Sequence, residues 1–269
     1  MMPATQLELL QIEIETIWDT DERGRINGPD LVIASSSVGS ITAIGSAVPD
    51  DLAAALKAVV SAVTPSDDAI SPPAALDQCR RLLEDTLGPV ELTPGSGPSC
   101  LIPETAAFRS AVPLVRSDVG DVTALRGANP GNWGAEEWQQ LLDGLLGPWV
   151  MATHESAVIS ICHTPASSKR GAEAGVWTRP EFRGQGHAAA VTSAWAALMR
   201  PTGRHLFYST SRTNVSSQRV AARLALHPLG WLLLPPPALL SPGSPGLSEV
   251  WRLDRADLRR TRCADAGRG

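Results

Sequence analysis

The spacing of hydrophobic and polar positions changes several times along the chain, and each change predicts an element. Alternation over residues 9–17 predicts a half-buried strand, which places Gln11, Glu13 and Glu15 on its polar face. Two more strands are expected over 31–34 and 40–44. Helical spacing begins after Pro49, and a second helix over 73–87 is expected to end at Gly88. These elements predict a small α+β unit in the N-terminal part of the chain.

A run of Pro, Gly and Ser over 93–99 carries the clearest boundary signal, although a loop inside one domain would look similar. Beyond it, helices are expected near 119–126 and over 135–145, with an open segment over 129–134 between them. Strands are expected over 149–153 and 157–163, joined by a short turn. We therefore expect domains over 1–100 and 101–255, followed by a flexible, arginine-rich tail over 256–269.

Residues 172–200 carry the pattern that is richest in chemistry. A strand is expected to end before Pro180, because the residue before a proline is extended, and an amphipathic helix comes after it. Between them lies a turn with small residues at 184, 186 and 188, made of Arg183, Gly184, Gln185, Gly186, His187 and Ala188. Small residues let the backbone approach a ligand, and a helix start offers free N–H groups to an anion. The pattern favours a pyrophosphate site, although a lone glycine turn is more often ordinary loop structure.

The same turn lacks the spacing of other phosphate-binding loops. It has neither the full glycine pattern of a dinucleotide fingerprint nor the Gly-Lys-Ser/Thr ending of a Walker A loop. Beyond its helix the chain continues with a strand over about 205–210 and a second helix capped by Asn214, with Val220 and Leu224 on the apolar face of that helix. The order strand, glycine turn, helix, strand, helix narrows the choice of family.

In this order the segment resembles the GNAT superfamily of acyl-CoA-dependent N-acetyltransferases. Its signature, Arg/Gln-x-x-Gly-x-Gly/Ala, is matched at Arg183, Gly186 and Ala188, and its companion helix motif at Asn214 and Ser217. The likeness covers about 115–255, is strongest between 172 and 226, and has no counterpart over 1–100. It implies a mixed, mostly antiparallel sheet flanked by helices, in an α+β fold with a smaller N-terminal α+β unit.

The resemblance also implies where acetyl-CoA, the co-substrate, would bind. Val176 and Thr178 would hold the pantetheine arm along a strand that splays from its neighbour, and residues 183–188 would hold the pyrophosphate. Asn214 and Ser217 would lie along the far side of the cofactor. The alternative is that the two strand residues are plain sheet positions and that Asn214 is only a helix cap.

Transfer to an amine needs a base, and Glu173 is the candidate that the resemblance implies. A buried setting would raise the pKa of its carboxyl. The alternative is a strand-end carboxylate paired with an arginine. His163 is a second candidate for the base. A metal site made of His163, Cys162 and His154 is not expected, because adjacent strand residues such as Cys162 and His163 point to opposite faces.

The expected general acid is missing from its usual place. The resemblance implies a tyrosine seven residues after Asn214, where this chain has Ala221. The one tyrosine of the chain is Tyr208, on the preceding strand. Tyr208 could protonate the leaving thiolate or could be a core residue, and water could take the acid role instead.

Composition and charge narrow the partners and the cellular location that we expect for the protein. The chain has 269 residues, 43% of them hydrophobic, and a net charge of −5, which does not favour a nucleic-acid partner. It has no apolar run of the roughly 18 residues that a membrane span needs, and its N-terminus has no signal-peptide pattern, so we expect a cytoplasmic protein without a membrane partner. The scattered cysteines, without a CxxC pair, predict free thiols.

The expected function is N-acetyl transfer from acetyl-CoA to a primary amine by direct attack. The acceptor would be a small-molecule amine or a protein amine. If it is a protein amine, the N-terminal unit would recognise the protein. The oligomeric state stays open, and a homodimer is one of the possibilities. The alternative is a catalytically inactive acyl-CoA-binding or regulatory module, because Ala221 replaces the usual acid.

Overall fold

The computed structural model describes residues 4–65, 68, 71–90, 96–119 and 121–233. They form two compact units that alternate along the sequence. The first unit contains residues 4–106, 166–174 and 199–233, and the second contains 107–165 and 175–198. The division into domains over 1–100 and 101–255 stays a prediction, and the tail expected over 256–269 lies outside the described residues.

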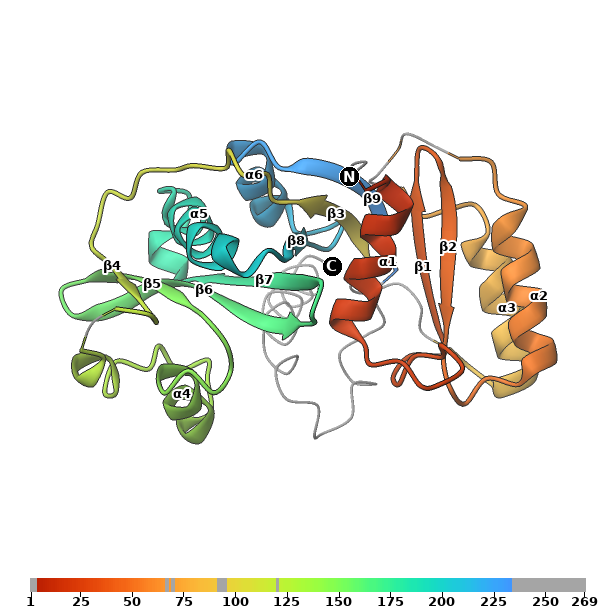
Figure 1. The fold of residues 1–269 in the computed structure, drawn as a ribbon, viewed down its shortest axis with the longest axis horizontal. Coiled ribbons are helices and arrows are strands. Elements are labelled where there is room, and N and C mark those ends of the chain that lie inside the picture. The colour runs from red at the N-terminus through yellow and green to blue at the C-terminus, as the bar shows by residue number, and fades with distance from the viewer. Residues whose placement is uncertain (1–3, 66–67, 69–70, 91–95, 120, 234–269) are drawn as a thin grey trace, which may run out of the picture. The chain divides into compact units, whose positions relative to one another are not determined.

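The first unit is built on strands in the order β2-β1-β9-β3-β8-β7 (Figure 1). These strands are β1 (Leu31–Ser36), β2 (Gly39–Ile44), β3 (Gly97–Leu101), β7 (Gly171–Thr178), β8 (His205–Ser209) and β9 (His227–Leu232). The pairs β1–β2, β1–β9, β3–β9 and β3–β8 are antiparallel, and β7–β8 is parallel. The helices are α1 (Gln6–Ile17), α2 (Asp50–Ser61), α3 (Leu76–Leu87) and α6 (Val215–Arg223).

The second unit contains strands in the order β7-β6-β5-β4. It adds β4 (Leu114–Arg116), β5 (Val150–His154), β6 (Ala157–Ser167), α4 (Ala135–Leu142) and α5 (His187–Met199). Figure 1 shows α4 and α5 on opposite faces of these strands. The apolar face of α4 packs on β5 and β6, in a core that includes Trp138, Leu141, Trp149, Met151 and Ile161. The expected mixed, mostly antiparallel α+β architecture is confirmed.

Residues 9–17 form a helix, so the predicted strand is wrong. Helix α1 begins with a reciprocal capping box, in which Glu8 N donates to Thr5 Oγ1 at 3.3 Å and Thr5 N donates to Glu8 Oε2 at 2.7 Å. Such a cap stabilises a helix start by about 0.5–2 kcal/mol. The helix is buried on more than one face, which gives its apolar positions a spacing that also fits a strand. Glu13, expected on an exposed face, is fully buried.

Other segments differ from the expected elements in smaller ways. The helix expected near 119–126 is only a 3₁₀ turn over Thr123–Leu125. Part of the proline- and glycine-rich boundary run is strand β3, which pairs with β8 on one side and β9 on the other. Strands β4 and β9 had no sequence prediction. The helices and strands expected elsewhere are present, with shifts of a few residues at their ends.

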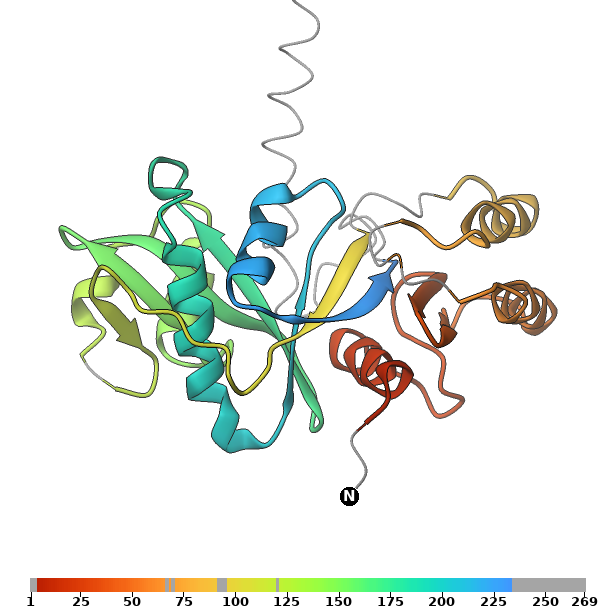
Figure 2. The same ribbon diagram turned by 90° about the horizontal axis from the view of Figure 1, so that it is seen from above.

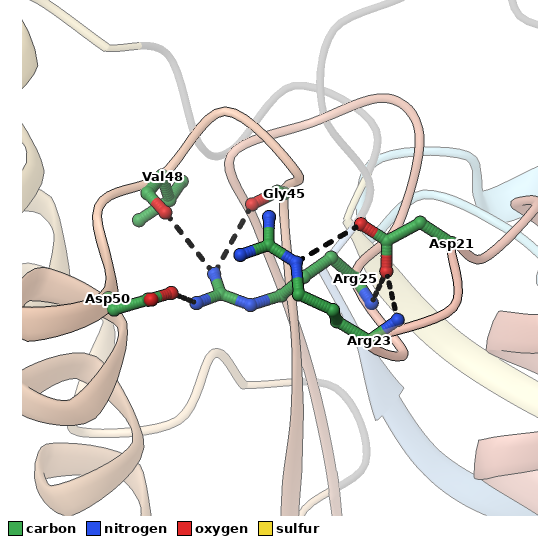
Figure 3. A network of polar contacts seen from close by, with 6 residues as sticks. All are labelled: Asp21, Arg23, Arg25, Gly45, Val48 and Asp50. Atoms are coloured by element: carbon green, nitrogen blue, oxygen red, sulfur yellow. Dashed lines mark hydrogen bonds and ion pairs between the residues drawn. The ribbon is translucent and has the colours of Figure 1, made fainter.

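Helices α2 and α3 lie side by side and pack on the β1–β2 hairpin (Figure 2). A buried arginine holds the loop before β1 to the start of α2 (Figure 3). Arg25 donates to the carbonyls of Gly45 and Val48 at 3.4 and 3.3 Å and pairs with Asp50 at 2.5 Å. Asp21 closes the turn, because its Oδ1 accepts the backbone N–H of Arg25 at 2.8 Å. This network gives the acidic first turn of α2 a fixed cationic partner.

Candidate active site

The glycine turn lies between β7 and α5 in the second unit. Its two glycines adopt positive φ angles, +78° at Gly184 and +92° at Gly186. A Cβ on Gly184 would meet no atom within 4 Å, so the backbone angle and not crowding requires glycine there. The turn expected from the sequence is therefore present, with a backbone that other residues rarely adopt.

The turn leads into a helix whose first amides have no intrahelical acceptor. The first backbone N–H with such an acceptor belongs to Ala190, which donates to Gly186 O at 3.0 Å. The N–H groups of His187, Ala188 and Ala189 precede it, at the positive end of the helix dipole. Together with the open turn before them, they provide the geometry that binds a phosphate anion.

Side chains brace this turn against the backbone that precedes it. Arg183 Nε donates to Thr178 O at 3.2 Å, and Gln185 Nε2 donates to Glu181 O at 3.3 Å. His187 is buried and lies 3.3 Å from Gln185 Oε1 through its Nε2. Burial, and secondarily the charge of His154, lowers the pKa of His187, so its ring is neutral at neutral pH. The exposed charge at the turn therefore comes from Arg183.

Strand β7 runs past the end of its pairing with β8. The parallel register covers Gly171 to Glu173, opposite His205 to Phe207, while β7 continues to Thr178. Val176 and Thr178 lie in this continuation and are half-buried. The Thr178 hydroxyl is 2.8 Å from that of Ser160. A strand that continues beyond its partner has backbone groups available for another ligand, as the resemblance implies.

Glu173 lies on β7, in the part that belongs to the first unit, and is only 4% exposed. Its Oε1 accepts two bonds from Ser209, from the backbone N–H and from the hydroxyl, both at 2.8 Å. Oε2 is buried and has no partner among the described residues. Desolvation raises the pKa of Glu173 to about 7, although the two Ser209 bonds act in the opposite direction. The alternative of an arginine partner has no bond in its favour in the described part of the chain.

Tyr208 lies on β8 in the first unit and is 2% exposed. Its hydroxyl is 2.6 Å from the hydroxyl of Ser217 at the start of α6. Asn214 caps that helix, because its side chain accepts from Ser217 N at 3.0 Å. Glu173 is in register with Phe207, and neighbouring strand residues alternate between faces, so Tyr208 and Glu173 point to opposite faces of the sheet.

His163 has a structural environment in the second unit. Its Nδ1 is 3.0 Å from the carbonyl oxygen of Gly175, and its ring stacks edge-on with Trp133 at 4.8 Å between centroids. Burial lowers the pKa of His163 to about 4, so the ring stays neutral. Trp133 comes from the open segment over 129–134. Among the described residues no three His, Cys, Asp or Glu side chains gather into a metal site.

The sequence did not point to Glu13 on α1. This carboxyl is fully buried in the first unit, and its Oε2 accepts from the Ser99 hydroxyl at 2.5 Å. Burial, and then the negative charge of Glu173, raises the pKa of Glu13 well above its usual range. The capping pattern Thr5-x-x-Glu8 could have shown that this segment is a helix, and a helix would have removed the reason to place Glu13 on an exposed face.

Residues 112–227 match the family model described as the acetyltransferase (GNAT) domain. This segment is a GNAT domain. It contains the glycine turn, Glu173 and Tyr208, and the resemblance drawn from the sequence motifs is confirmed. A comparison with curated proteins gave no match.

Several solved structures are similar to this chain. A GNAT-family acetyltransferase from Colwellia psychrerythraea has 16% identity and a TM-score of 0.43, over 80% of this chain and 78% of that one. A GCN5-related N-acetyltransferase-like protein from Streptococcus suis has 16% identity and a TM-score of 0.43, over 84% and 88%. A Salmonella typhimurium structure described with its cofactor acetyl-CoA has 17% identity and a TM-score of 0.34, over 47% and 94%.

Two further features concern the setting of the GNAT domain. No helix in the described part of the chain is both long and apolar enough to cross a membrane. Cys79, Cys100 and Cys162 are buried and none of them is in a disulfide, as expected, and Cys263 lies outside the described residues.

Proposed function

We propose that this protein is an N-acetyltransferase that moves an acetyl group from acetyl-CoA to a primary amine by direct nucleophilic attack. The observation that carries the proposal is the glycine turn over 183–188, which opens onto the unpaired amides of α5 inside the GNAT domain. A pyrophosphate is the anion that such a turn fits best.

The proposed binding roles are those that the family resemblance implies. The turn residues Arg183, Gly184, Gln185, Gly186, His187 and Ala188 hold the pyrophosphate, chiefly through backbone N–H groups. Val176 and Thr178 offer the backbone of β7 to the pantetheine arm, beyond the end of the β8 pairing. Asn214 and Ser217 line the cofactor from the first turn of α6.

Acetyl-CoA supplies the acetyl group as a thioester. Glu173 takes the proton of the attacking amine on Oε2, the oxygen that Ser209 does not occupy. A pKa of about 7 suits this role, since a base poised near the working pH is both ionised and basic enough. Tyr208 or water protonates the departing thiolate.

The acceptor is a small-molecule amine or a protein amine, and we propose that the reaction takes place in the cytoplasm. A chain with a net charge of −5 suits a cationic acceptor only weakly through its overall field. The identity of the acceptor therefore depends on local groups, and a panel of amines is the direct way to find it.

The test has a binding step and a turnover step. Acetyl-CoA at about 100 times its Kd should stabilise the folded protein by about 2.7 kcal/mol in urea unfolding. Thiol release from acetyl-CoA is then followed over small diamines, amino sugars and lysine-containing peptides. Stabilisation together with amine-dependent thiol release supports the proposal. Stabilisation without thiol release would identify an inactive acyl-CoA-binding module, and the absence of both would reject acetyl-CoA as the co-substrate.

Two glycines make a matched pair for the binding step. Gly184 and Gly203 have φ angles of +78° and +69°, and a Cβ on either would meet nothing within 4 Å. Alanine at each position therefore introduces a similar backbone strain of roughly 1–2 kcal/mol. Gly184→Ala should weaken acetyl-CoA binding about tenfold, because the free turn relaxes to an unstrained φ and binding then has to restore the strained one, at a cost of about one factor of ten in affinity. Gly203→Ala should bind as the wild type does.

A further inference from the structure

Two buried carboxyls approach the same pair of serines in the first unit. Ser99 on β3 and Ser209 on β8 are direct partners in the antiparallel register. The Ser99 hydroxyl donates to Glu13 Oε2 from one strand, and Ser209 donates twice to Glu173 Oε1 from the other. Side chains at directly opposed positions lie about 5 Å apart at Cβ when they share a face. The serine pair thus brings together carboxyls that are 160 residues apart in sequence (173 − 13).

Each carboxyl has one oxygen that is bonded and one that is not. Glu13 Oε1 and Glu173 Oε2 are both buried without a partner among the described residues. A buried acceptor without a donor destabilises the fold, and more strongly when the group is charged. One added proton, held on Glu13 and directed to Glu173, would serve both oxygens.

Among the described residues, no positive charge balances these groups. The elements around them contribute Ser99 and Cys100 from β3 and Ser209 from β8, and in the described part of the chain no arginine, lysine or histidine bonds to either carboxyl. The pKa of the Cys100 thiol is raised to about 12, by burial first and then by the two glutamates, so the thiol stays neutral. Two ionised carboxylates here would therefore repel each other without compensation.

We infer that Glu13 is a positioning residue for Glu173: it keeps a proton on Oε1 and donates it to Oε2 of Glu173, so that the two carboxyls share a single proton. The role in acetyl transfer rests on the proposed function, whereas the shared proton belongs to the protein without any substrate. Glu13 then acts as a neutral hydrogen-bond donor that orients the base and stabilises its ionised form.

The order in which the two groups titrate agrees with this arrangement. Burial and the charge of Glu173 raise the pKa of Glu13 well above its usual range, while the pKa of Glu173 is about 7. The charge of Glu173 is among the causes that raise the pKa of Glu13, whereas no charge of Glu13 raises the pKa of Glu173, so Glu13 keeps its proton when Glu173 loses its own. Environments that push two carboxyl pKa values apart are the pattern that assigns different roles to each.

The backbone explains how Glu13 can reach this position. A Cβ on Gly171, at the start of β7, would collide with Thr16 Oγ1 of α1 and with the ring of Phe207. Thr16 in turn lies 3.0 Å from the hydroxyl of Ser168. A glycine at 171 thus lets α1 pack closely against the strand that carries Glu173, and Glu13 lies on this helix.

The first test is a carbon-13 NMR titration of the glutamate carboxyls in the protein without substrate. The wild type should retain one protonated carboxyl at pH 8, and Glu13→Gln should remove it. In Glu173→Gln the midpoint of Glu13 should move to lower pH, because the neighbouring charge is gone. An unchanged Glu13 midpoint in Glu173→Gln, or two ionised carboxyls at pH 8, overturns the inference. This result is independent of whether acetyl transfer occurs.

The second test is the pH profile of kcat/KM. Glu13→Leu removes the hydrogen bond that Glu13 donates to Glu173, so the acid limb of the kcat/KM profile should move to higher pH by about one unit. Glu13→Gln still has an amide that donates, so its acid limb should be that of the wild type. Glu15→Gln, on the same helix beside Arg170, is the control and should change nothing. An unshifted limb in folded Glu13→Leu overturns the positioning role, and if that variant does not fold the titration decides.

Discussion

Replacing the proposed base should make the protein more stable at alkaline pH. Burial raises the pKa of Glu173 from 4.5 to about 7, which corresponds to about 3 kcal/mol because one pKa unit is about 1.4 kcal/mol. A carboxyl whose pKa is higher in the folded than in the unfolded protein destabilises the fold when it is ionised. Its unfavourable contribution is absent below pH 4.5, grows between pH 4.5 and about 7, and is complete above that.

Glu173→Gln removes this penalty and keeps an oxygen for the two Ser209 donors. The new amide N–H groups are buried at the position of Oε2, and leaving them without an acceptor costs about 1 kcal/mol. The expected net gain in the free energy of unfolding is therefore about 2 kcal/mol at pH 8, and it should disappear at pH 5.

The assay is urea unfolding of the wild type and Glu173→Gln at both pH values. His163, whose pKa is lowered to about 4, makes the wild-type curve change in the opposite direction, because its buried neutral ring is favoured as pH rises. That contribution cancels in the difference between the two proteins. Glu104→Gln, at an exposed position, is the control for a lost surface charge. A Glu173→Gln protein that is no more stable than the wild type at pH 8 would refute the buried-carboxyl argument.

Three further changes test other parts of the structure. Tyr208→Phe should lower kcat without changing the KM for the amine if the phenol protonates the thiolate. The variant also loses the bond to Ser217, which should lower the free energy of unfolding by about 1 kcal/mol. This loss of stability with an unchanged kcat would show that Tyr208 is a packing residue. Arg25→Met should lower the free energy of unfolding, measured in urea, by about 1–3 kcal/mol, because two carbonyls and Asp50 lose their donor. The affinity for acetyl-CoA should not change. Wild-type stability of this variant would show that the loop does not need the network. Gly171→Ala should destabilise the first unit by roughly 1–3 kcal/mol, because α1 must move away from its contact with β7, and wild-type stability would contradict that close approach.

The motif-bearing segment was predictable because local chemistry determines it. The turn before α5 needs glycines for its positive φ angles, Pro180 ends β7, and Asn214 caps α6, so each signal acts within a few residues of its effect. The buried settings of Glu173 and Tyr208 also follow from their places on central strands. Short-range rules therefore recovered the glycine turn, whereas Glu173 was named as a candidate base through the family resemblance.

The errors arise where distant parts of the chain decide the outcome. Residues 9–17 form a helix that other parts of the chain bury on more than one face, so apolar spacing alone was ambiguous. The local Thr5-x-x-Glu8 capping pattern was the signal that could have resolved it. Strand β3 lies in a proline- and glycine-rich run and gains its pairing from β8 and β9, more than 100 residues later in the sequence. Glu13 could not be recognised as a partner of Glu173 until α1 was known to pack beside β7.

Amine-dependent release of the CoA thiol, compared between the wild type and Glu173→Gln at pH 8, tests the central claim most directly. We predict release by the wild type with at least one amine of the panel, and a loss of about 100-fold or more in Glu173→Gln, in line with the usual contribution of a general base. Equal release by both proteins would contradict the role of Glu173. No release by the wild type with any amine, despite bound acetyl-CoA, would contradict acetyl transfer itself.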